Sequence, residues 1–395
     1  MALGRKGWFV LDHDPIYLAH GSYGGCLKLA FEDRLIWHKK LESNPHQFLV
    51  YESSHEIKKS RERLGQYLGC NQSNLVYFPN PSTALNAVIR SLNLTKNDEV
   101  LTTNHEYGAL DKTWQYYSSK KGFHYKRINI DIPFDDKQKF IKSFLENITN
   151  NTKLIFLSHI TSSTALIFPV KEICKIAKER NILTIIDGAH GPAQVDFSIS
   201  DIKPDIYVGA CHKWMCSPKG VSFLYANKNI QNSIDPLVIS WGWGNDASNE
   251  SQFIDYHQWQ GTNDISAYLT IPSILDFFKK HNWGQISSNC HNLILDVKNM
   301  FSQFDSKCQP TSNNENHIGQ MLSFKINQNS KLIDGVIKNP NKVIEIQSII
   351  FNQSKIHIPI IVWDSQVFMR ISIQAYNTKD DVYEMFKMLK YFNLF

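Results

Sequence analysis

Residues 183–220 read LTIIDGAHGPAQVDFSISDIKPDIYVGACHKWMCSPKG, and this stretch carries the strongest indication of the fold. An apolar run, Leu183–Ile186, ends in Asp187, and a second run at 205–209 leads into Lys213. Short apolar runs bounded by glycine and polar residues predict buried strands of a parallel sheet. An acid and a lysine just beyond such strands lie at the edge where α/β folds bind ligands.

The pairing of Lys213 with Asp187 is one that pyridoxal 5′-phosphate (PLP) chemistry requires. A lysine amine holds the aldehyde of PLP as a Schiff base, and a carboxylate keeps its pyridine nitrogen protonated. His212, Trp214 and Met215 flank the lysine, and apolar surroundings lower the pKa of an amine and make it nucleophilic. Each residue has a structural alternative, since a lysine after a strand is usually solvated and an acid there often caps a helix.

Other motifs supply candidate ligands for the cofactor and its substrate. Asn80-Pro81-Ser82-Thr83 precedes a predicted helix and forms either an anion site or a plain helix cap. His190 is either a buried core residue or a partner of the phenolic oxygen, and His105 follows a strand and could stack on a flat ring. Arg370 lies inside an apolar strand, where its guanidinium suits a substrate carboxylate unless the strand is at an edge.

The alternation of strands and helices predicts an α/β fold with a mostly parallel sheet covered by helices on both faces. Expected strands and helices of this part are 74–78, 82–92, 99–103, 153–158, 170–180, 183–186, 205–209 and 221–225. After about residue 265 the pattern becomes α+β, with helices at 265–280, 283–304 and 379–392, and strands at 319–326, 343–351 and 369–373. We therefore expect an N-terminal segment, 1–20, that joins the smaller domain, a large cofactor-binding domain, 21–265, and a small α+β domain, 266–395.

Composition and charge exclude several classes of protein. The 395 residues carry 42 basic and 37 acidic side chains without a basic stripe, so we expect no nucleic-acid partner. No apolar run reaches the ~18 residues of a membrane span, and the N-terminus lacks a signal-peptide core, which predicts a cytoplasmic enzyme. The seven scattered cysteines predict reduced thiols and no metal site. No Walker or GxGxxG motif occurs, which argues against a nucleotide or nicotinamide enzyme.

Taken together, the motifs resemble those of the class V aminotransferase family of fold-type I PLP enzymes, in its isopenicillin N epimerase-like and cysteine desulfurase-like branch. The matching segments run in the family's order from residue 18 to residue 372: LAHGSYG at 18–24, NHEYGA at 104–109, SHITS at 158–162, DGAH at 187–190, HKW at 212–214, SWGW at 240–243, GTND at 261–264 and RIS at 370–372. The resemblance implies a seven-stranded, mostly parallel sheet between helices, a smaller C-terminal α+β domain and PLP as cofactor.

The resemblance also implies a role for each candidate residue. Lys213 would form the Schiff base, Asp187 would pair with the pyridinium nitrogen, and His105 would stack on the ring. Further cofactor contacts would come from Ser82, Thr83, His159, His190 and His212. Arg370 would bind the substrate carboxylate, with His20 and Tyr23 beside the substrate. Thr262, in Gly261-Thr262, would contact the phosphate of the partner subunit, which implies a homodimer.

The expected reaction begins with an amino-acid substrate that forms an external aldimine and loses its α-proton to Lys213. Epimerisation or C–S lysis is the first expectation, and transamination the next; epimerisation needs a second acid–base group, for which Tyr23, His20 and Tyr107 are candidates. A desulfurase is disfavoured, because HIPIIVWDSQVFMR at 357–370 has no cysteine before Arg370. A catalytically silent scaffold of the same fold is the alternative outside enzymes.

Overall fold

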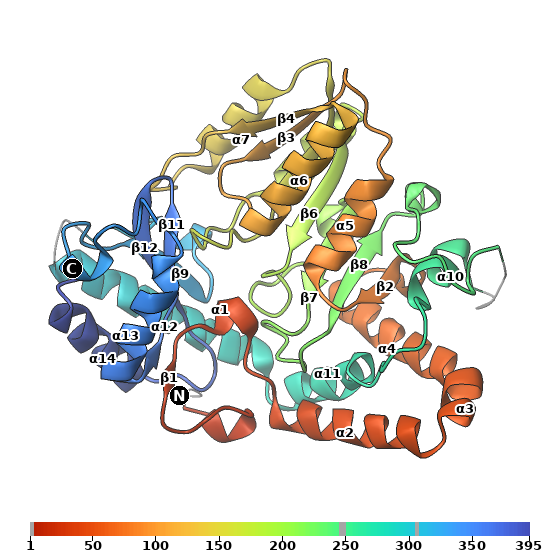
Figure 1. Ribbon diagram of the computed structural model, residues 1–395, viewed down its shortest axis with the longest axis horizontal. Coiled ribbons are helices and arrows are strands. Elements are labelled where there is room, and N and C mark those ends of the chain that lie inside the picture. Colours follow the sequence, from red (N-terminus) through yellow and green to blue (C-terminus); the bar gives the residue numbers. More distant parts are fainter. Residues whose placement is uncertain (1–3, 245–249, 305–307) are drawn as a thin grey trace.

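The computed structural model describes residues 4–244, 250–304 and 308–395, and within them seven strands form a central sheet (Figure 1). In spatial order these strands are β2 (Leu75–Phe78), β8 (Ser222–Ala226), β7 (Ile206–Ala210), β6 (Leu183–Gly188), β5 (Thr152–Ser158), β3 (Glu99–Thr103) and β4 (His124–Ile128). Strands β7, β6, β5, β3 and β4 run parallel, and β8 runs opposite to them, so that it is antiparallel to both β7 and β2. The mostly parallel α/β fold predicted from the sequence is confirmed.

Helices cover both faces of this sheet, as the pattern of burial along the strands requires. In β5, Leu154 and Phe156 pack in one apolar cluster, while Ile155 and Leu157 pack in another. Successive side chains of a strand point to opposite faces, so a strand apolar at every position is buried on both. The helices that pack on its strands are α4 (Ser53–Leu68), α5 (Pro81–Ser91), α6 (Gly108–Lys121), α7 (Lys137–Asn147), α8 (Val170–Glu179) and α10 (Gln252–Gln258). The same part of the chain also contains α2 (Lys28–Ser43), α3 (Pro45–Gln47), α9 (Ile199–Ile202) and α11 (Ile271–Lys280).

The C-terminal part contains a second, antiparallel sheet in the order β11 (Ile360–Trp363), β12 (Gln366–Ser372), β9 (Met321–Lys325). It packs with helices α12 (Trp283–Phe304), α13 (Lys342–Ser354) and α14 (Lys379–Tyr391). The N-terminal strand β1 (Ile16–Tyr17) pairs with β10 (Ile356–His357). Figure 1 shows the short helix α1 (His20–Tyr23) between this part and the central sheet. Residues 16–17 therefore lie against residues 356–357 of the C-terminal part.

One expected element was wrong, because residues 343–351 form helix α13 and not a strand. The segment is rich in β-branched residues, which favour strands. Its burial has a helical period instead, since Ile346 and Ile350 are buried four residues apart while Ile344 and Ile349 are exposed. Packing of one apolar stripe overrides local propensity here.

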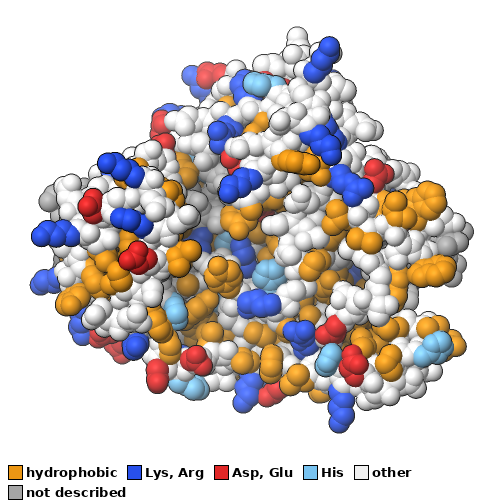
Figure 2. All heavy atoms as spheres, viewed as in Figure 1, with side chains coloured by type: hydrophobic (Ala, Val, Ile, Leu, Met, Phe, Trp, Pro, Cys, Tyr) orange, Lys and Arg blue, Asp and Glu red, His pale blue; other side chains and the backbone are white. Residues whose placement is uncertain are grey.

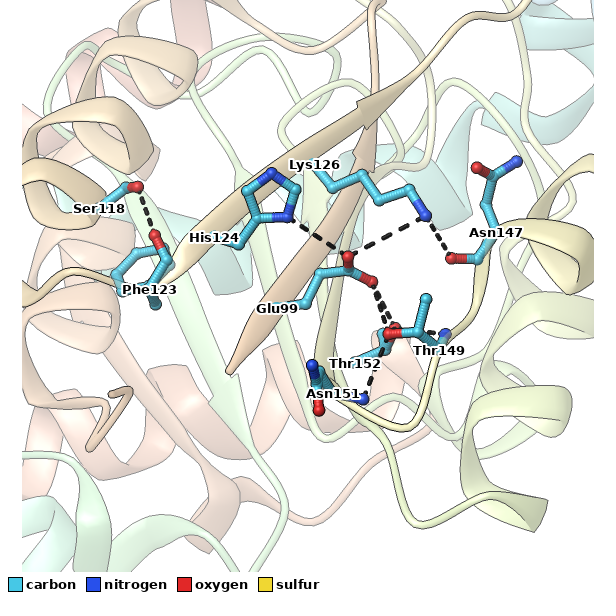
Figure 3. A network of polar contacts seen from close by, with 9 residues as sticks. All are labelled: Glu99, Ser118, Phe123, His124, Lys126, Asn147, Thr149, Asn151 and Thr152. Atoms are coloured by element: carbon cyan, nitrogen blue, oxygen red, sulfur yellow. Dashed lines mark hydrogen bonds and ion pairs between the residues drawn. The ribbon is translucent and has the colours of Figure 1, made fainter. Parts of the chain in front are cut away.

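A buried carboxylate ties three neighbouring strands together at their amino ends (Figure 3). Glu99 of β3 accepts hydrogen bonds from Thr152 Oγ1 of β5 at 2.6 Å and from Thr149 Oγ1 at 3.3 Å. Its second oxygen lies 3.4 Å from His124 Nδ1 and 4.0 Å from Lys126 Nζ, both on β4. The register of β3 against β5 shifts at Glu99, and these contacts satisfy the polar groups at that irregularity.

Within the described residues, none of the helices combines the length and the apolar character that crossing a bilayer demands.

Candidate active site

A cavity of about 460 Å³ lies at the carboxyl ends of the central strands, between α1, the start of α5 and strands β11 and β12. In Figure 2 this face is hollowed between the two parts of the molecule, and Lys, Arg and His side chains are visible in the hollow. The cavity brings together seven of the residues predicted from the sequence: Tyr23, Ser82, Asp187, His190, His212, Lys213 and Arg370. They come from separate segments of the chain.

Asp187 is the second-last residue of β6, and Lys213 follows the end of β7 by three residues. The two strands lie side by side in parallel register. Asp187 is 4% exposed, and its Oδ1 accepts the backbone N–H of Ala189 at 3.0 Å. Burial raises the pKa of Asp187, against the opposing effects of that hydrogen bond and of the Lys213 charge. Burial also lowers the pKa of Lys213 to about 8, with Asp187 raising it and the Arg370 charge lowering it further. About a tenth of the amine is therefore unprotonated at pH 7, far more than for an ordinary lysine.

His190 contacts the lysine directly. Its Nε2 lies 3.0 Å from Lys213 Nζ, and its Nδ1 accepts the indole N–H of Trp214 at 3.2 Å. Burial, together with the charges of Lys213 and Arg370, holds the pKa of His190 well below its ordinary value. The imidazole of His190 is therefore uncharged at neutral pH.

The amino end of α5 offers an anion site beside the cavity. Asn80 caps this helix, and its Oδ1 accepts the N–H of Thr83 at 2.8 Å and the hydroxyl of Thr83 at 3.0 Å. Ser82 and Asn80 line the cavity, whereas Thr83 belongs to the cap and is not part of the lining. His212 donates from Nδ1 to the carbonyl of Val221 at 2.8 Å, so its Nε2 is left for a ligand. Burial lowers the pKa of His212 to about 4. A helix amino end with a serine and a histidine suits a phosphate.

Arg370 is a buried guanidinium without a carboxylate partner among the described residues. Only 3% of the residue is exposed, yet it lines the cavity. Its Nη2 donates to Ser22 Oγ at 2.8 Å and its Nη1 to the carbonyl and hydroxyl of Ser162, while Nε has no partner. Burial lowers its pKa to about 10, so it stays charged at neutral pH. A buried unpaired charge is costly, and a carboxylate ligand would offset that cost.

The structure places His105 outside the cavity, so its predicted contact with the cofactor ring has no geometric support. Its Nε2 donates to the carbonyl of Ile130 at 2.8 Å, and its Nδ1 accepts the Thr164 hydroxyl at 2.7 Å. The neighbouring Tyr107, at the start of α6, lines the cavity in its place. From the sequence, Tyr107 is predicted only as a candidate acid–base group, and the place beside the ring is predicted for His105.

Two further predicted histidines are buried beside the cavity and do not line it. His20 donates from Nε2 to the backbone carbonyl of Lys213 at 3.1 Å, and its Nδ1 lies 2.8 Å from the Tyr376 hydroxyl. His159 lies with Nδ1 2.9 Å from the hydroxyl of Tyr207. His20 therefore supports the backbone of the lysine instead of touching a substrate.

Thr262 also lies outside this cavity, on an exposed segment beside a separate groove. The predicted contact with a partner's phosphate agrees with an exposed position, and the single chain leaves that contact a prediction.

Sequence reasoning missed Ser22 and Ser162, the two serines that hold Arg370. Ser162 follows the end of β5 by four residues, and Ser22 lies in α1 next to Tyr23. The rule that polar residues after strand ends build the site would have found Ser162, and nothing local distinguishes Ser22. Within the described residues, no group of three or more His, Cys, Asp or Glu side chains could hold a metal ion.

A second buried carboxyl, Glu106, lies beside the end of β5, the strand next to the one that carries Asp187, and was not predicted. Its Oε2 accepts the backbone N–H of Ser158 at 2.9 Å and pairs with the Ser158 hydroxyl at 2.6 Å; Oε1 accepts the Thr103 hydroxyl at 2.7 Å. Burial raises the pKa of Glu106 to about 7, the hydrogen bonds oppose this, and the charge of Asp187 adds to it.

The pKa of Glu106 rises from 4.5 to about 7 on folding. Its contribution to the free energy of unfolding is therefore complete below pH ~4.5 and is lost as the pH rises through 7. We expect Glu106→Gln to remove this dependence. Relative to the variant, the wild type should lose roughly 1–3 kcal/mol of unfolding free energy between pH ~5 and ~8. Urea unfolding at both pH values measures it, with the exposed Glu42→Gln as control. Curves for wild type and Glu106→Gln that stay parallel would contradict the assignment.

Comparison with known proteins adds independent evidence. A family model described as Aminotransferase class-V matches residues 37–385. The isopenicillin N epimerase of Streptomyces clavuligerus is 26% identical over 331 residues, 81% of this chain and 83% of that protein. A probable chloroplastic L-cysteine desulfhydrase of Arabidopsis thaliana is 25% identical over 406 residues, 94% of this chain and 82% of that protein.

Solved structures agree with the fold. The apo structure of a cysteine desulfurase from Thermococcus onnurineus NA1 has a TM-score of 0.82 at 18% identity, covering 99% of this chain and 98% of that one. The complex of the cystine C–S lyase C-DES with cysteine persulfide has a TM-score of 0.79 at 17% identity, covering 96% and 98%. Another structure of C-DES carries glycine linked to its PLP cofactor. With the family model spanning most of the sequence, this chain belongs to the class-V aminotransferase family of fold-type I enzymes, whose cofactor is pyridoxal 5′-phosphate.

Proposed function

We propose that this protein is a PLP-dependent C–S lyase that cleaves the Cβ–S bond of a cysteine-type amino acid. The observation that carries the proposal is the shared cavity of Lys213, Asp187 and the unpaired, buried Arg370. An amine, an acid and a carboxylate-binding cation in one site match the needs of an α-amino acid bound to PLP. The desulfhydrase relatives support the lyase assignment.

The residues present fit the cofactor. The amine of Lys213 would hold its aldehyde, Asp187 its pyridine nitrogen, and the start of α5 with Ser82 and His212 its phosphate. Tyr107, which lines the cavity, would take the place beside the ring that was predicted for His105 from the sequence. When bound, PLP supplies an electron-withdrawing ring that acidifies the α-carbon of an attached amino acid.

The protein's own groups then carry the remaining steps. Arg370 binds the carboxylate and fixes the orientation of the α-carbon. Lys213 Nζ accepts the α-proton, for which its low pKa is suited. The Cβ–S bond breaks, sulfur leaves with the bonding electrons and takes a proton, and the enamine product is hydrolysed. For cysteine, the balance is cysteine and water giving pyruvate, ammonia and hydrogen sulfide.

Epimerisation is the second candidate, because a site for a second acid–base group exists. Tyr23 and Tyr107 both line the cavity, whereas His20 does not. The lyase reaction comes first because a single base, Lys213, is enough for it. The isopenicillin N epimerase relative supports the alternative.

A persulfide-forming desulfurase is disfavoured by the position of the thiols. None of the seven cysteines, all within the described ranges, lines the cavity. Cys308 is buried, and its Sγ donates to the carbonyl of Leu394. Transamination and a silent scaffold remain as outcomes of the experiments below. The cytoplasmic location, the absence of a nucleic-acid partner and the division at residues 20 and 265 stay predictions.

A homodimer with composite sites also belongs to this proposal. An apolar groove of about 670 Å³, lined by Val50, Ile57, Trp241, Trp259 and Thr262 among others, lies apart from the active-site cavity. Trp241 is 79% exposed, and exposed apolar surface of this kind marks association sites. A second copy that covers the groove would bring Gly261-Thr262 to its partner's phosphate.

We expect purified protein with PLP to show a visible absorbance band that Lys213→Ala abolishes, because Lys213 is the lysine whose amine lies in the cavity. Borohydride reduction should attach the cofactor to the peptide containing Lys213. The exposed Lys228→Ala is the control and should keep the band. Sulfide and pyruvate release from L-cysteine or cysteine conjugates would support the lyase, racemisation without release the epimerase, and amino-group transfer to a keto acid an aminotransferase. A protein that stays colourless would be a scaffold.

Arg370→Gln should keep the visible band and raise KM by about 10–100-fold, since a charge-assisted hydrogen bond to a carboxylate is worth about 1.5–3 kcal/mol. Titration of the band with amino acids and with their carboxyl-free amines separates the loss of carboxylate binding from a general loss of affinity for ligands. Amines should bind the variant and the wild type equally. A KM for the amino acid that does not change would show that the carboxylate is bound elsewhere.

Subunit complementation tests the composite site. Thr262→Val alone should weaken PLP binding about tenfold through loss of one phosphate hydrogen bond. Hybrid dimers of Lys213→Ala with Thr262→Val should regain one complete site, because both changes then affect the same site. A hybrid whose cofactor binds no better than in the Thr262→Val homodimer would place Thr262 outside the partner's site.

A further inference from the structure

The hydrogen bond between Trp214 and His190 has a consequence for the lysine that neither contact shows alone. The indole nitrogen of Trp214 is only a donor, and it lies 3.2 Å from His190 Nδ1. Nδ1 must therefore be the acceptor, without a hydrogen of its own. In a neutral imidazole the hydrogen then sits on Nε2, which lies 3.0 Å from Lys213 Nζ.

We propose that Trp214 is a positioning residue that locks His190 in the Nε2–H tautomer, so that this N–H is directed at the amine of Lys213. The proposal deepens the proposed function, because it rests on Lys213 as the reactive amine.

Packing and hydrogen bonds hold both Trp214 and His190 in place. Trp214 is fully buried, and its ring lies 4.8 Å from the ring of His20. The turn that carries it is closed by Cys216, whose N–H donates to the carbonyl of Lys213 at 3.0 Å. The backbone of His190 is held by Gln194, whose side chain donates to the His190 carbonyl at 2.8 Å. The donor and the acceptor are therefore fixed before any ligand arrives.

The tautomer decides which form of the amine is favoured. An Nε2–H can donate only to the lone pair of an uncharged amine, whereas a bare Nε2 would accept from the ammonium. The other groups that face this pair are Asp187 on β6, Arg370 on β12, and His20 and His212, both neutral because burial lowers their pKa values. Asp187 raises the pKa of Lys213 and Arg370 lowers it. The hydrogen bond from His190 Nε2–H therefore decides which protonation state of the amine is favoured.

The tautomer can be measured without the cofactor. In protein labelled with 15N-histidine and free of PLP, the signal that disappears in His190→Gln belongs to His190. Protonation at Nε2 in the wild type supports the proposal, and protonation at Nδ1 overturns it. This result does not depend on whether the protein binds PLP, so it stands apart from a failure of the proposed function.

A variant pair tests the cause. Trp214→Phe keeps an aromatic ring but removes the N–H; it should release the Nδ1–H tautomer and raise the pKa of Lys213 by about one unit. Competitive acetylation of cofactor-free protein across pH, read by mass spectrometry of the Lys213 peptide, measures that pKa. In the His190→Gln background Trp214→Phe should have no effect, because an amide has no tautomer to lock.

Trp114→Phe is the matched control. Trp114 is equally buried, but its indole N–H has no partner in the described chain, so its loss should leave Lys213 unchanged. The proposal would be overturned if Trp214→Phe shifted the pKa of Lys213 equally in the wild type and in the His190→Gln background, or if it left the tautomer unchanged. Should Trp214→Phe fail to fold, the wild-type tautomer still decides.

Discussion

Two buried cations share one small cavity with one buried carboxylate, and this charge balance governs the rest of the site. Burial and the charge of Arg370 lower the pKa of Lys213, and Asp187 offsets only part of that effect. The cavity without a ligand is therefore positively charged. In the proposed function a phosphate and a substrate carboxylate would neutralise it, and the same imbalance favours both the binding of an anionic ligand and an unprotonated amine.

The surroundings of Lys213 come from distant parts of the chain. The central sheet supplies the turn on which it lies, and α1 supplies His20, which holds its carbonyl. Gly24, in the same N-terminal segment, lies against this turn. Its φ is +69°, and a Cβ there would lie 2.2 Å from the carbonyl oxygen of His212. A larger residue at position 24 would push the N-terminal segment off the lysine. The turn that carries Lys213 is thus held by the N-terminal segment as well as by the central sheet.

Much of this arrangement could be predicted from the sequence, because the signals were local. Strand ends followed by Asp187 and Lys213 indicated their edge of the sheet, and the helix expected at 283–304 agrees with α12. The failures have non-local causes. His105 turns away from the cavity because its ring is hydrogen-bonded by Thr164 and Ile130, which are 59 and 25 residues distant in sequence. Residues 343–351 are helical because Ile346 and Ile350 are buried together in the apolar core. Ser22 acquires its role only when α1 meets β12.

The pairing of β1 with β10, and of Ala19 with Ser372, has a consequence for the newly made chain. Residues 16–19 are synthesised more than 330 residues before their partners at 356–357 and Ser372. Until then the lysine lacks its outer support, and Arg370 does not yet exist in the chain. All strands of the central sheet are present once residue 226 has been made, whereas the cavity is complete only after Arg370 has been added. The strands of the central sheet are therefore made before the residues that complete the cavity.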